Sequence, residues 1–222
     1  MTRFLLASAL GLYAAAASPL TINFDTDPVG NPVSNGTIVD SLYASQGVTF
    51  SATSTGACGS NPPHIYANDD DPSGFTLSSP PNVVTTCTGS SASDIEESVE
   101  GAVRADFVQS ASQVCIDVFP DDSGDRGFIR AYDASFTLLT TVFSTPGVMQ
   151  NLCVSAAGIR TVIFAGDAGT NSFARFDNLV ITFSSAPIVA PATIPTLGPT
   201  GTVLLLAGLA LAGLWTVRRR RV

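Results

Sequence analysis

Residues 113–119 read QVCIDVF and residues 150–155 read QNLCVS, and these two stretches decide which fold is expected. Side chains of a β-strand point alternately to its two faces. Valine and isoleucine of the first stretch therefore share one face, while Cys115 and Asp117 share the other. Cys153 likewise lies opposite the aliphatic residues of the second stretch. Two antiparallel strands with this pattern could join their cysteines, which predicts a β-sheet with a Cys115–Cys153 disulfide.

The other two cysteines of the chain are Cys58 and Cys87. An even number of cysteines in an exported chain indicates disulfides, and four cysteines allow three pairings. With Cys115 paired to Cys153, the second predicted bridge is Cys58–Cys87. A zinc site is disfavoured because the cysteines lack C-x-x-C spacing.

The middle of the chain repeats short alternating or β-branched runs between turn residues, without a long helical period. About ten to twelve such runs predict an all-β fold, a jelly-roll-like antiparallel β-sandwich over residues 18–185. Residues 51–93, rich in Ser, Thr, Gly and Pro, are expected to form an insertion, and a short helix is expected at Val39–Ser45. The expected strands are Leu20–Phe24, Gly47–Ala52, Ile65–Ala67, Gly74–Leu77, Val83–Thr86, Ser98–Val108, Gln113–Phe119, Gly127–Tyr132, Leu138–Phe143, Asn151–Ser155, Ile159–Ala165 and Arg175–Phe183.

Charge is distributed unevenly along the chain. All 18 carboxylates lie between Asp25 and Asp177, where five arginines offset them and leave a net charge of −13. Nucleic-acid binding is therefore not expected, because phosphate contacts need a basic face. The single histidine, His64, argues against a histidine-rich zinc site. It also leaves one imidazole as a base for a Ser-His-Asp or Cys-His mechanism.

The first 17 residues have the parts of a secretory signal peptide. Arg3 provides a positive start, an apolar run begins at Phe4, and the Ala15–Ala17 triplet supplies the small residues that signal peptidase requires. We expect cleavage after Ala17. The alternative is an uncleaved membrane anchor, for which the apolar run is short.

The chain ends in an apolar segment and a basic cluster. Residues 201–217 (GTVLLLAGLALAGLWTV) carry no charge and predict a transmembrane helix, about 25 Å long at 1.5 Å per residue. The alternative is a buried core helix followed by a basic tail. Residues 218–222 are expected to stay in the cytoplasm because they hold the cluster Arg218, Arg219, Arg220 and Arg221. Both ends would then lie at the inner membrane, with the domain between them in the periplasm.

Residues 186–200 (APIVAPATIPTLGPT) join the domain to the apolar segment. Their prolines keep the stretch extended, which suits a protease cleft. The expected recognition motif consists of Ile194, Pro195, Thr196 and Leu197.

The order of this motif, a short spacer, an apolar helix and an arginine cluster resembles the IPTL-CTERM sorting signal, a relative of the PEP-CTERM signals of Gram-negative bacteria. One departure is Gly-Pro-Thr after the motif, where the family usually has a Ser-Glu-Trp-like stretch. The resemblance implies recognition by an exosortase-type membrane transpeptidase. It also implies release or re-anchoring outside the cell, in bacteria that make exopolysaccharide.

Short stretches of the domain also resemble the β-sandwich ectodomains of PEP-CTERM-type proteins and, more distantly, the jelly rolls of carbohydrate-binding modules. The resemblance implies the fold and an exported location, since most such ectodomains have no assigned activity. The stretches are INFD…GVTF (22–50), IDVF (116–119), AYDASFTLL (131–139) and FDNLVITF (176–183).

Two aspartates mark a candidate metal site. Asp25 ends the first expected strand, and Asp177 lies near the start of the last. The terminal strands of a jelly roll often run antiparallel side by side, which would bring the two carboxylates together. Adjacent carboxylates repel each other unless a cation separates them or one is protonated. A structural Ca²⁺ held by Asp25 and Asp177 is therefore predicted; the alternatives are two independent surface aspartates, or an Asp177 that bonds turn amides.

Two other acidic stretches are expected to be solvated turns. An EF-hand loop needs glycine at its sixth position and glutamate at its twelfth. Counted from Asp121, these positions are Arg126 and Tyr132. The run Asp69–Asp71 is also expected to be a solvated loop.

The expected function is that of a non-catalytic envelope or matrix protein that associates with exopolysaccharide. Tyr43, Tyr66 and Tyr132 could stack on sugars, although alternating aromatic residues of a sandwich more often lie in its core. One alternative is a carboxylate-dependent glycan hydrolase or lyase, because paired carboxylates suffice for that chemistry. Another is a purely structural matrix protein.

Overall fold

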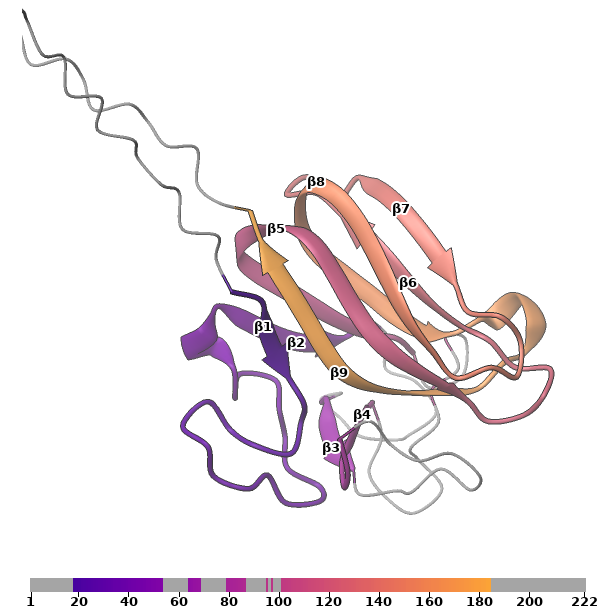
Figure 1. Ribbon diagram of the computed structural model, residues 1–222, viewed down its shortest axis with the longest axis horizontal. Helices are drawn as coiled ribbons and strands as arrows, with labels where there is room; N and C mark the ends of the chain where they lie inside the picture. Colours follow the sequence, from indigo (N-terminus) through magenta and orange to yellow (C-terminus); the bar gives the residue numbers. More distant parts are fainter. Residues whose placement is uncertain are drawn as a thin grey trace, which may run out of the picture. The chain divides into compact units, whose positions relative to one another are not determined.

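The computed structural model describes residues 18–53, 64–68, 79–86, 95, 97 and 101–184. Within these ranges the chain is mostly antiparallel β-sheet, with two 3-10 helices, η1 (Ala44–Gln46) and η2 (Ala168–Thr170) (Figure 1). The strands are β1 (Leu20–Ile22), β2 (Val48–Ala52), β3 (Tyr66–Asn68), β4 (Val83–Thr85), β5 (Val103–Pro120), β6 (Gly127–Tyr132), β7 (Leu138–Phe143), β8 (Gln150–Gly166) and β9 (Ala174–Phe183).

Two long strands, β5 and β8, organise the sheet. The strand order is β3-β4-β9-β5-β8-β6-β7, with β1 paired to β9 and β2 paired to β5. The first part of β5 lies between β2 and β8, whereas its second part, from Ala111, lies between β9 and β8. Register shifts between Asp106 and Gln113 interrupt the ladder where the neighbours change. Each long strand therefore contributes to both layers of a β-sandwich.

Aromatic and aliphatic side chains fill the space between the layers. The ring centroids of Phe164 on β8 and Phe176 on β9 lie 5.1 Å apart. The start of β6 approaches this contact so closely that a Cβ atom at Gly127 would lie 2.5 Å from Val118 Cγ1. Glycine is therefore the residue that lets β6 pack against the opposite layer.

A second aromatic group lies beneath β1 and β2. The rings of Phe24, Tyr43 and Phe50 meet edge to face, with centroids 5.7 to 6.2 Å apart. The Tyr43 hydroxyl donates to the Thr26 carbonyl oxygen at 2.9 Å, so its polar end is satisfied. Tyr43 and Tyr66 are both buried, which places them in the core rather than on a sugar-binding surface.

The structure corrects two expectations about local structure. The predicted helix at Val39–Ser45 is a series of turns followed by η1, which ends where Gly47 adopts a left-handed φ of 82°. The runs expected as four separate strands form two continuous ones, β5 and β8. The expected breaks, at residues 109–112 and 156–158, are instead irregular points within continuous strands, where the register of the β5–β8 pair shifts.

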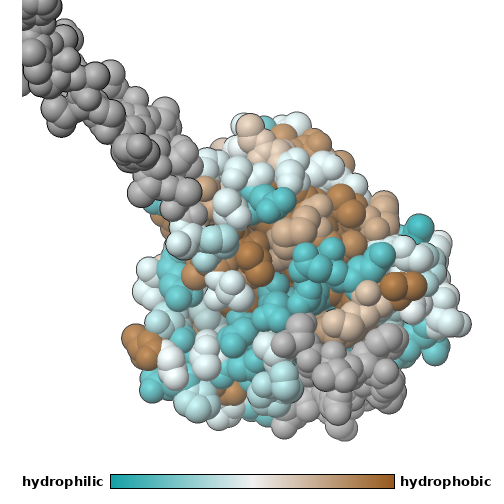
Figure 2. Space-filling view, in the orientation of Figure 1, coloured by the Kyte–Doolittle hydropathy of each residue, from teal (hydrophilic) through white to brown (hydrophobic). Residues whose placement is uncertain are grey.

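The outer surface mixes polar and apolar residues. Figure 2 shows brown residues among teal and white ones over β5, β8 and β9 on the face that it presents.

None of the helices in the described ranges is long and apolar enough to cross a membrane. The predicted signal peptide 1–17 and transmembrane segment 201–217 lie outside those ranges.

Candidate functional site

The two terminal strands lie side by side, as the sequence predicted. β1 pairs antiparallel with β9, with Leu20 opposite Ile181 and Ile22 opposite Leu179. This register brings the residues just after β1 next to the first half of β9. Asp25 and Asp177 come from these two segments, and the charge of Asp25 acts on the Asp177 carboxyl.

Asp177 is the buried member of the pair, with an exposed fraction of 0 %. Its Oδ2 accepts a hydrogen bond from the Ser79 backbone N–H at 3.0 Å, and the Ser79 hydroxyl lies 2.9 Å from Oδ1. The backbone N–H of Asn178 donates to Oδ1 at 2.6 Å. Burial raises the pKa of Asp177 to about 7 in spite of these donors, and the charge of Asp25 contributes in the same direction.

Asp25 lies closer to solvent and is held by Asn82. The backbone N–H of Asn82 donates to Asp25 Oδ1 at 2.8 Å. Burial raises the pKa of Asp25, although this hydrogen bond works against the shift. Without a cation, both carboxyl groups are therefore pushed toward their protonated forms.

The Asn82 side chain is held by two main-chain carbonyl groups. Its amide nitrogen donates to the carbonyl oxygens of Phe24 at 3.1 Å and Val33 at 2.9 Å, which fixes the orientation of the amide. Its Oδ1 is buried and has no hydrogen-bond partner within the described ranges. Such an oxygen costs free energy unless a donor or a cation satisfies it.

These groups fit a hard divalent cation. Two carboxylates and an amide oxygen are the ligand types that Ca²⁺ takes, whereas nitrogen and sulfur ligands, which zinc prefers, do not take part. A cation beside Asp25 and Asp177 would offset their repulsion. The site lies within the packed scaffold, between the terminal strands and the residues that precede β4.

A second acidic cluster lies at the turn between β5 and β6. Single carboxylate oxygens of Asp121, Asp122 and Asp125 lie within 4.8 Å of one another. The Asp122 N–H donates to Asp125 Oδ2 at 3.1 Å, and Arg175 lies 3.4 Å from Asp121 Oδ1. These contacts are typical of a solvated, hydrogen-bonded turn, which was the expected role of the loop. The run Asp69–Asp71 lies outside the described residues.

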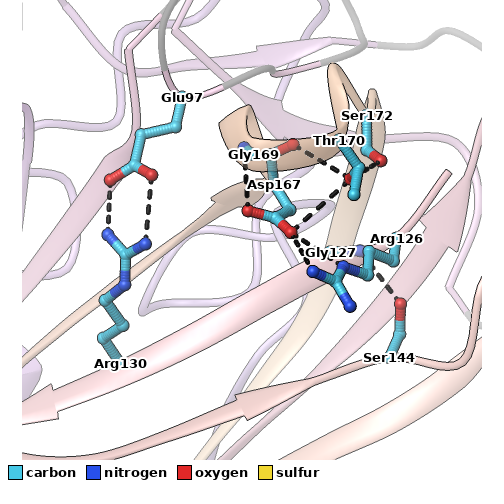
Figure 3. Close-up of polar contacts among 9 residues, drawn as sticks. All are labelled: Glu97, Arg126, Gly127, Arg130, Ser144, Asp167, Gly169, Thr170 and Ser172. Carbon is cyan, nitrogen blue, oxygen red and sulfur yellow. Dashed lines mark hydrogen bonds and ion pairs between the residues drawn. The ribbon is translucent and has the colours of Figure 1, made fainter.

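Two ion pairs involve β6 and its neighbours: Arg126 precedes β6 and pairs with Asp167 after β8, and Arg130 within β6 pairs with Glu97 (Figure 3). The Arg126 Nε atom donates to Asp167 Oδ2 at 2.7 Å, while Arg130 forms a two-pronged pair with Glu97. Asp167 also accepts from the Gly169 N–H at the start of η2. Both arginines are thereby committed to neighbouring carboxylates, which indicates a structural role.

The single histidine pairs with an acid. His64 Nδ1 lies 2.6 Å from Asp40 Oδ2, and its ring meets Tyr66 edge to face. The contacts of His64 within the described ranges include no serine or cysteine nucleophile. They therefore supply two members of a triad without the third.

The predicted disulfide between Cys115 and Cys153 is confirmed. The two residues face each other across β5 and β8, and their Cα atoms lie 4.0 Å apart. Cross-strand bonds flank the bridge on the same face: Asn151 donates to Asp117 at 2.7 Å, and Gln113 donates to Ser155 at 3.1 Å. Cys58 and Cys87 lie outside the described residues.

The predicted sorting residues also lie outside the described ranges. They are Ile194, Pro195, Thr196, Leu197, Arg218, Arg219, Arg220 and Arg221.

Sequence reasoning missed Ser79 and Asn82. Both were assigned to the insertion 51–93, yet they contribute directly to the site. The one available signal was the position of Asn82, a polar residue immediately before the apolar pair Val83–Val84. A polar residue beside a buried strand needs partners in the core.

Comparisons with known proteins give distant structural likenesses. No protein-family model matches the chain, and no curated protein sequence is significantly similar to it. The tandem CBM22 domain of Xyn10C from Paenibacillus barcinonensis is similar over 86 % of this chain and 51 % of that chain, with a TM-score of 0.40 and 14 % identity. This chain thus spans about half the length of that protein.

Two other structures are similar at the same level. Isomalto-dextranase from Arthrobacter globiformis T6, solved with panose, matches 75 % of this chain and 32 % of its own, with a TM-score of 0.36 and 12 % identity. The family 29 carbohydrate-binding module CBM29-2 matches 64 % of this chain and 99 % of its own, with a TM-score of 0.27 and 18 % identity.

Proposed function

We propose that this chain is an exported, non-catalytic β-sandwich protein of the cell envelope or extracellular matrix that associates with exopolysaccharide. Signal peptidase would cleave its precursor, which would then stay in the inner membrane with its domain in the periplasm. An exosortase-type transpeptidase would then release or re-anchor it. The IPTL motif and the two apolar ends of the sequence support this route.

One observation carries the non-catalytic part of the proposal. The acidic pair predicted from the sequence lies in the scaffold, where Asp177 has no exposed surface and receives three hydrogen bonds from Ser79 and Asn178. A glycosidase acid must reach the glycosidic oxygen from a cleft. This pair is built instead to hold strands together.

Calcium is the cation that we propose for this pair. Asp25, Asp177 and Asn82 would hold it, and it would supply positive charge without taking part in a reaction. Terminal strands held in this way would keep the domain folded outside the cell.

A binding experiment tests the proposal. The full chain, purified in a detergent without a sugar headgroup, is screened against neutral and acidic oligosaccharides in the presence of Ca²⁺. We expect saturable binding to at least one glycan and no new reducing ends after prolonged incubation. Glycan cleavage would overturn the non-catalytic assignment, and the lack of any glycan binding would overturn the association with exopolysaccharide.

A further inference from the structure

A pocket lies on the outer surface where β5, β8 and the turn between β6 and β7 meet. Its volume is about 250 Å³, just below the range of ligand pockets, roughly 300–1,000 Å³. It is separate from the buried Asp25–Asp177 pair. Its walls combine charged, hydroxyl and aromatic side chains: Arg104, Asp106, Asp133, Phe136, Arg160 and Thr161.

An aromatic wall is presented by the turn. Phe136 is 48 % exposed and stacks on Tyr132, with ring centroids 4.5 Å apart and planes 7° from parallel. The Arg104 guanidinium lies 4.9 Å from the centroid of the Phe136 ring. Tyr132, one of the three tyrosines considered for sugar stacking, therefore supports an exposed phenylalanine instead of lying in the core.

The turn itself is pre-formed. Asp133 Oδ1 accepts the backbone N–H groups of Ser135 at 2.8 Å and Thr137 at 2.9 Å, and Phe136 has a φ of 59°. A left-handed conformation is unfavourable for a bulky residue, so the surrounding hydrogen bonds must hold it in place. Such a turn presents the ring without a large ordering cost when a ligand binds.

The floor of the pocket is a fixed set of polar groups. Asp106 Oδ1 accepts from Arg104 Nε at 3.0 Å, Arg104 Nη2 at 2.8 Å and Thr161 Oγ1 at 2.6 Å. All three bonds end on Oδ1, and none of them uses Oδ2. About a third of each of the Arg104 and Asp106 side chains stays exposed. A carboxylate beside a guanidinium offers both acceptors and donors to neighbouring hydroxyl groups.

The charges of the pocket balance. Arg104 and Arg160 face Asp106 and Asp133, while the rest of the domain is strongly acidic. A polyanion would therefore be repelled at long range and find no net positive charge in the pocket. A neutral ligand that is rich in hydroxyl groups and has one apolar face suits these walls better.

We propose that this pocket binds one pyranose ring of a neutral glycan, with C–H groups of the sugar against the exposed edge of Phe136 and vicinal hydroxyl groups on Arg104 and Asp106. The proposal rests on the proposed association with exopolysaccharide and names the site and ligand class for it. We assign binding and not cleavage to the pocket, because Asp106 accepts from Arg104 and Thr161 and Asp133 accepts from its own turn.

The test uses the full chain and titrations with xylohexaose, cellohexaose, mannohexaose, maltohexaose and an oligogalacturonate. Phe136→Asn removes the ring and keeps a residue that tolerates the left-handed conformation. Arg104→Gln removes the charge from the floor. Phe143→Thr serves as the matched control, because Phe143 is also an exposed phenylalanine, 43 % exposed, and does not line the pocket. Melting temperatures confirm that each variant is folded.

We expect a neutral hexasaccharide to bind the wild type, with affinity at least about tenfold weaker in both pocket variants and unchanged in Phe143→Thr. Glycan binding that persists in both variants would overturn the pocket and leave the proposed function intact. Binding of the oligogalacturonate alone would overturn the neutral ligand class. Failure of the wild type to bind any of the glycans would remove both the pocket and the proposed association.

Discussion

Ser79 holds the buried Asp177 carboxylate with two groups, its backbone N–H at 3.0 Å from Oδ2 and its hydroxyl at 2.9 Å from Oδ1. The two residues are 98 positions apart in the chain. A segment that the sequence marks as an insertion therefore forms one wall of the site between the terminal strands.

Ser79→Ala is expected to destabilise the fold. The change removes a hydroxyl from a buried carboxylate, which costs about 1–3 kcal/mol. For a domain of this size that lowers the melting temperature by several degrees, at roughly 2–4 °C per kcal/mol. Ser112→Ala is the matched control, because the Ser112 hydroxyl makes its bond to the Thr182 carbonyl oxygen at an exposed position. Equal melting temperatures for the two variants would show that the Ser79 hydroxyl does not support the site.

Without divalent cations, stability is expected to fall as the pH rises from about 4 to about 7. The folded chain raises the pKa of Asp177 from 3.8 to about 7, chiefly through burial. Between pH 4 and pH 7, Asp177 therefore binds a proton in the folded state but not in the unfolded state. The free energy of unfolding falls as the pH rises through this interval, until Asp177 loses its proton in the folded state as well. Over this pH interval the free energy of unfolding changes by an amount on the order of a few kcal/mol.

Urea unfolding in EDTA at several pH values measures this dependence. General repulsion among the carboxylates acts in the same direction, so the series is repeated with Asp177→Asn. The variant should show a clearly flatter profile between pH 4 and pH 7. Identical slopes for the two proteins would assign the effect to general repulsion.

Loss of the cross-strand disulfide is expected to cost about 2–4 kcal/mol. The bridge joins residues 38 positions apart, so it removes considerable freedom from the unfolded chain. Urea unfolding of the double variant Cys115→Ala with Cys153→Ala tests this cost without leaving an odd cysteine.

A non-reducing digest of the wild type should also yield a Cys58–Cys87 peptide, and alkylation of either cysteine before reduction would contradict that second bridge.

The sorting proposal predicts that two separate changes block maturation. Replacing Arg218–Arg221 with glutamine removes the cytoplasmic retention signal. Replacing Pro195 with alanine lets the recognition segment leave its extended form. Immunoblots in a host with an exosortase should show precursor accumulating in both cases. Normal conversion of both variants to the mature size would rule out the sorting signal.

The sequence predicted those features that follow from alternation along strands. The face of Cys115 could be read from its apolar neighbours, and the partner face of Cys153 in the same way. The pairing of β1 with β9 followed from the usual arrangement of terminal strands, and the structure has it. For the two cysteines a local pattern is sufficient, because a strand has only two faces. The pairing of the terminal strands follows from the expected fold class.

Features that depend on distant packing could not be read in this way. Nothing local to Ser79 or Asn82 indicates that they meet Asp177 and Asp25. The pocket residue Phe136 depends on a turn held by Asp133 and on a neighbouring ring, Tyr132. Tyr43, by contrast, looked like a candidate for sugar stacking and is core, because the segment after β1 folds over it.

A calcium titration of the melting temperature tests the proposal that Ca²⁺ joins the terminal strands at Asp25 and Asp177. At matched ionic strength, Ca²⁺ should raise the melting temperature of the wild type more than Mg²⁺, because Mg²⁺ demands a tighter octahedral shell. A hundredfold excess over Kd corresponds to about 2.7 kcal/mol. The difference should disappear in Asp177→Asn and persist in Asp122→Asn, whose residue lies in the acidic turn. Equal shifts with both ions, or a calcium-specific shift that survives Asp177→Asn, would contradict calcium binding between Asp25 and Asp177.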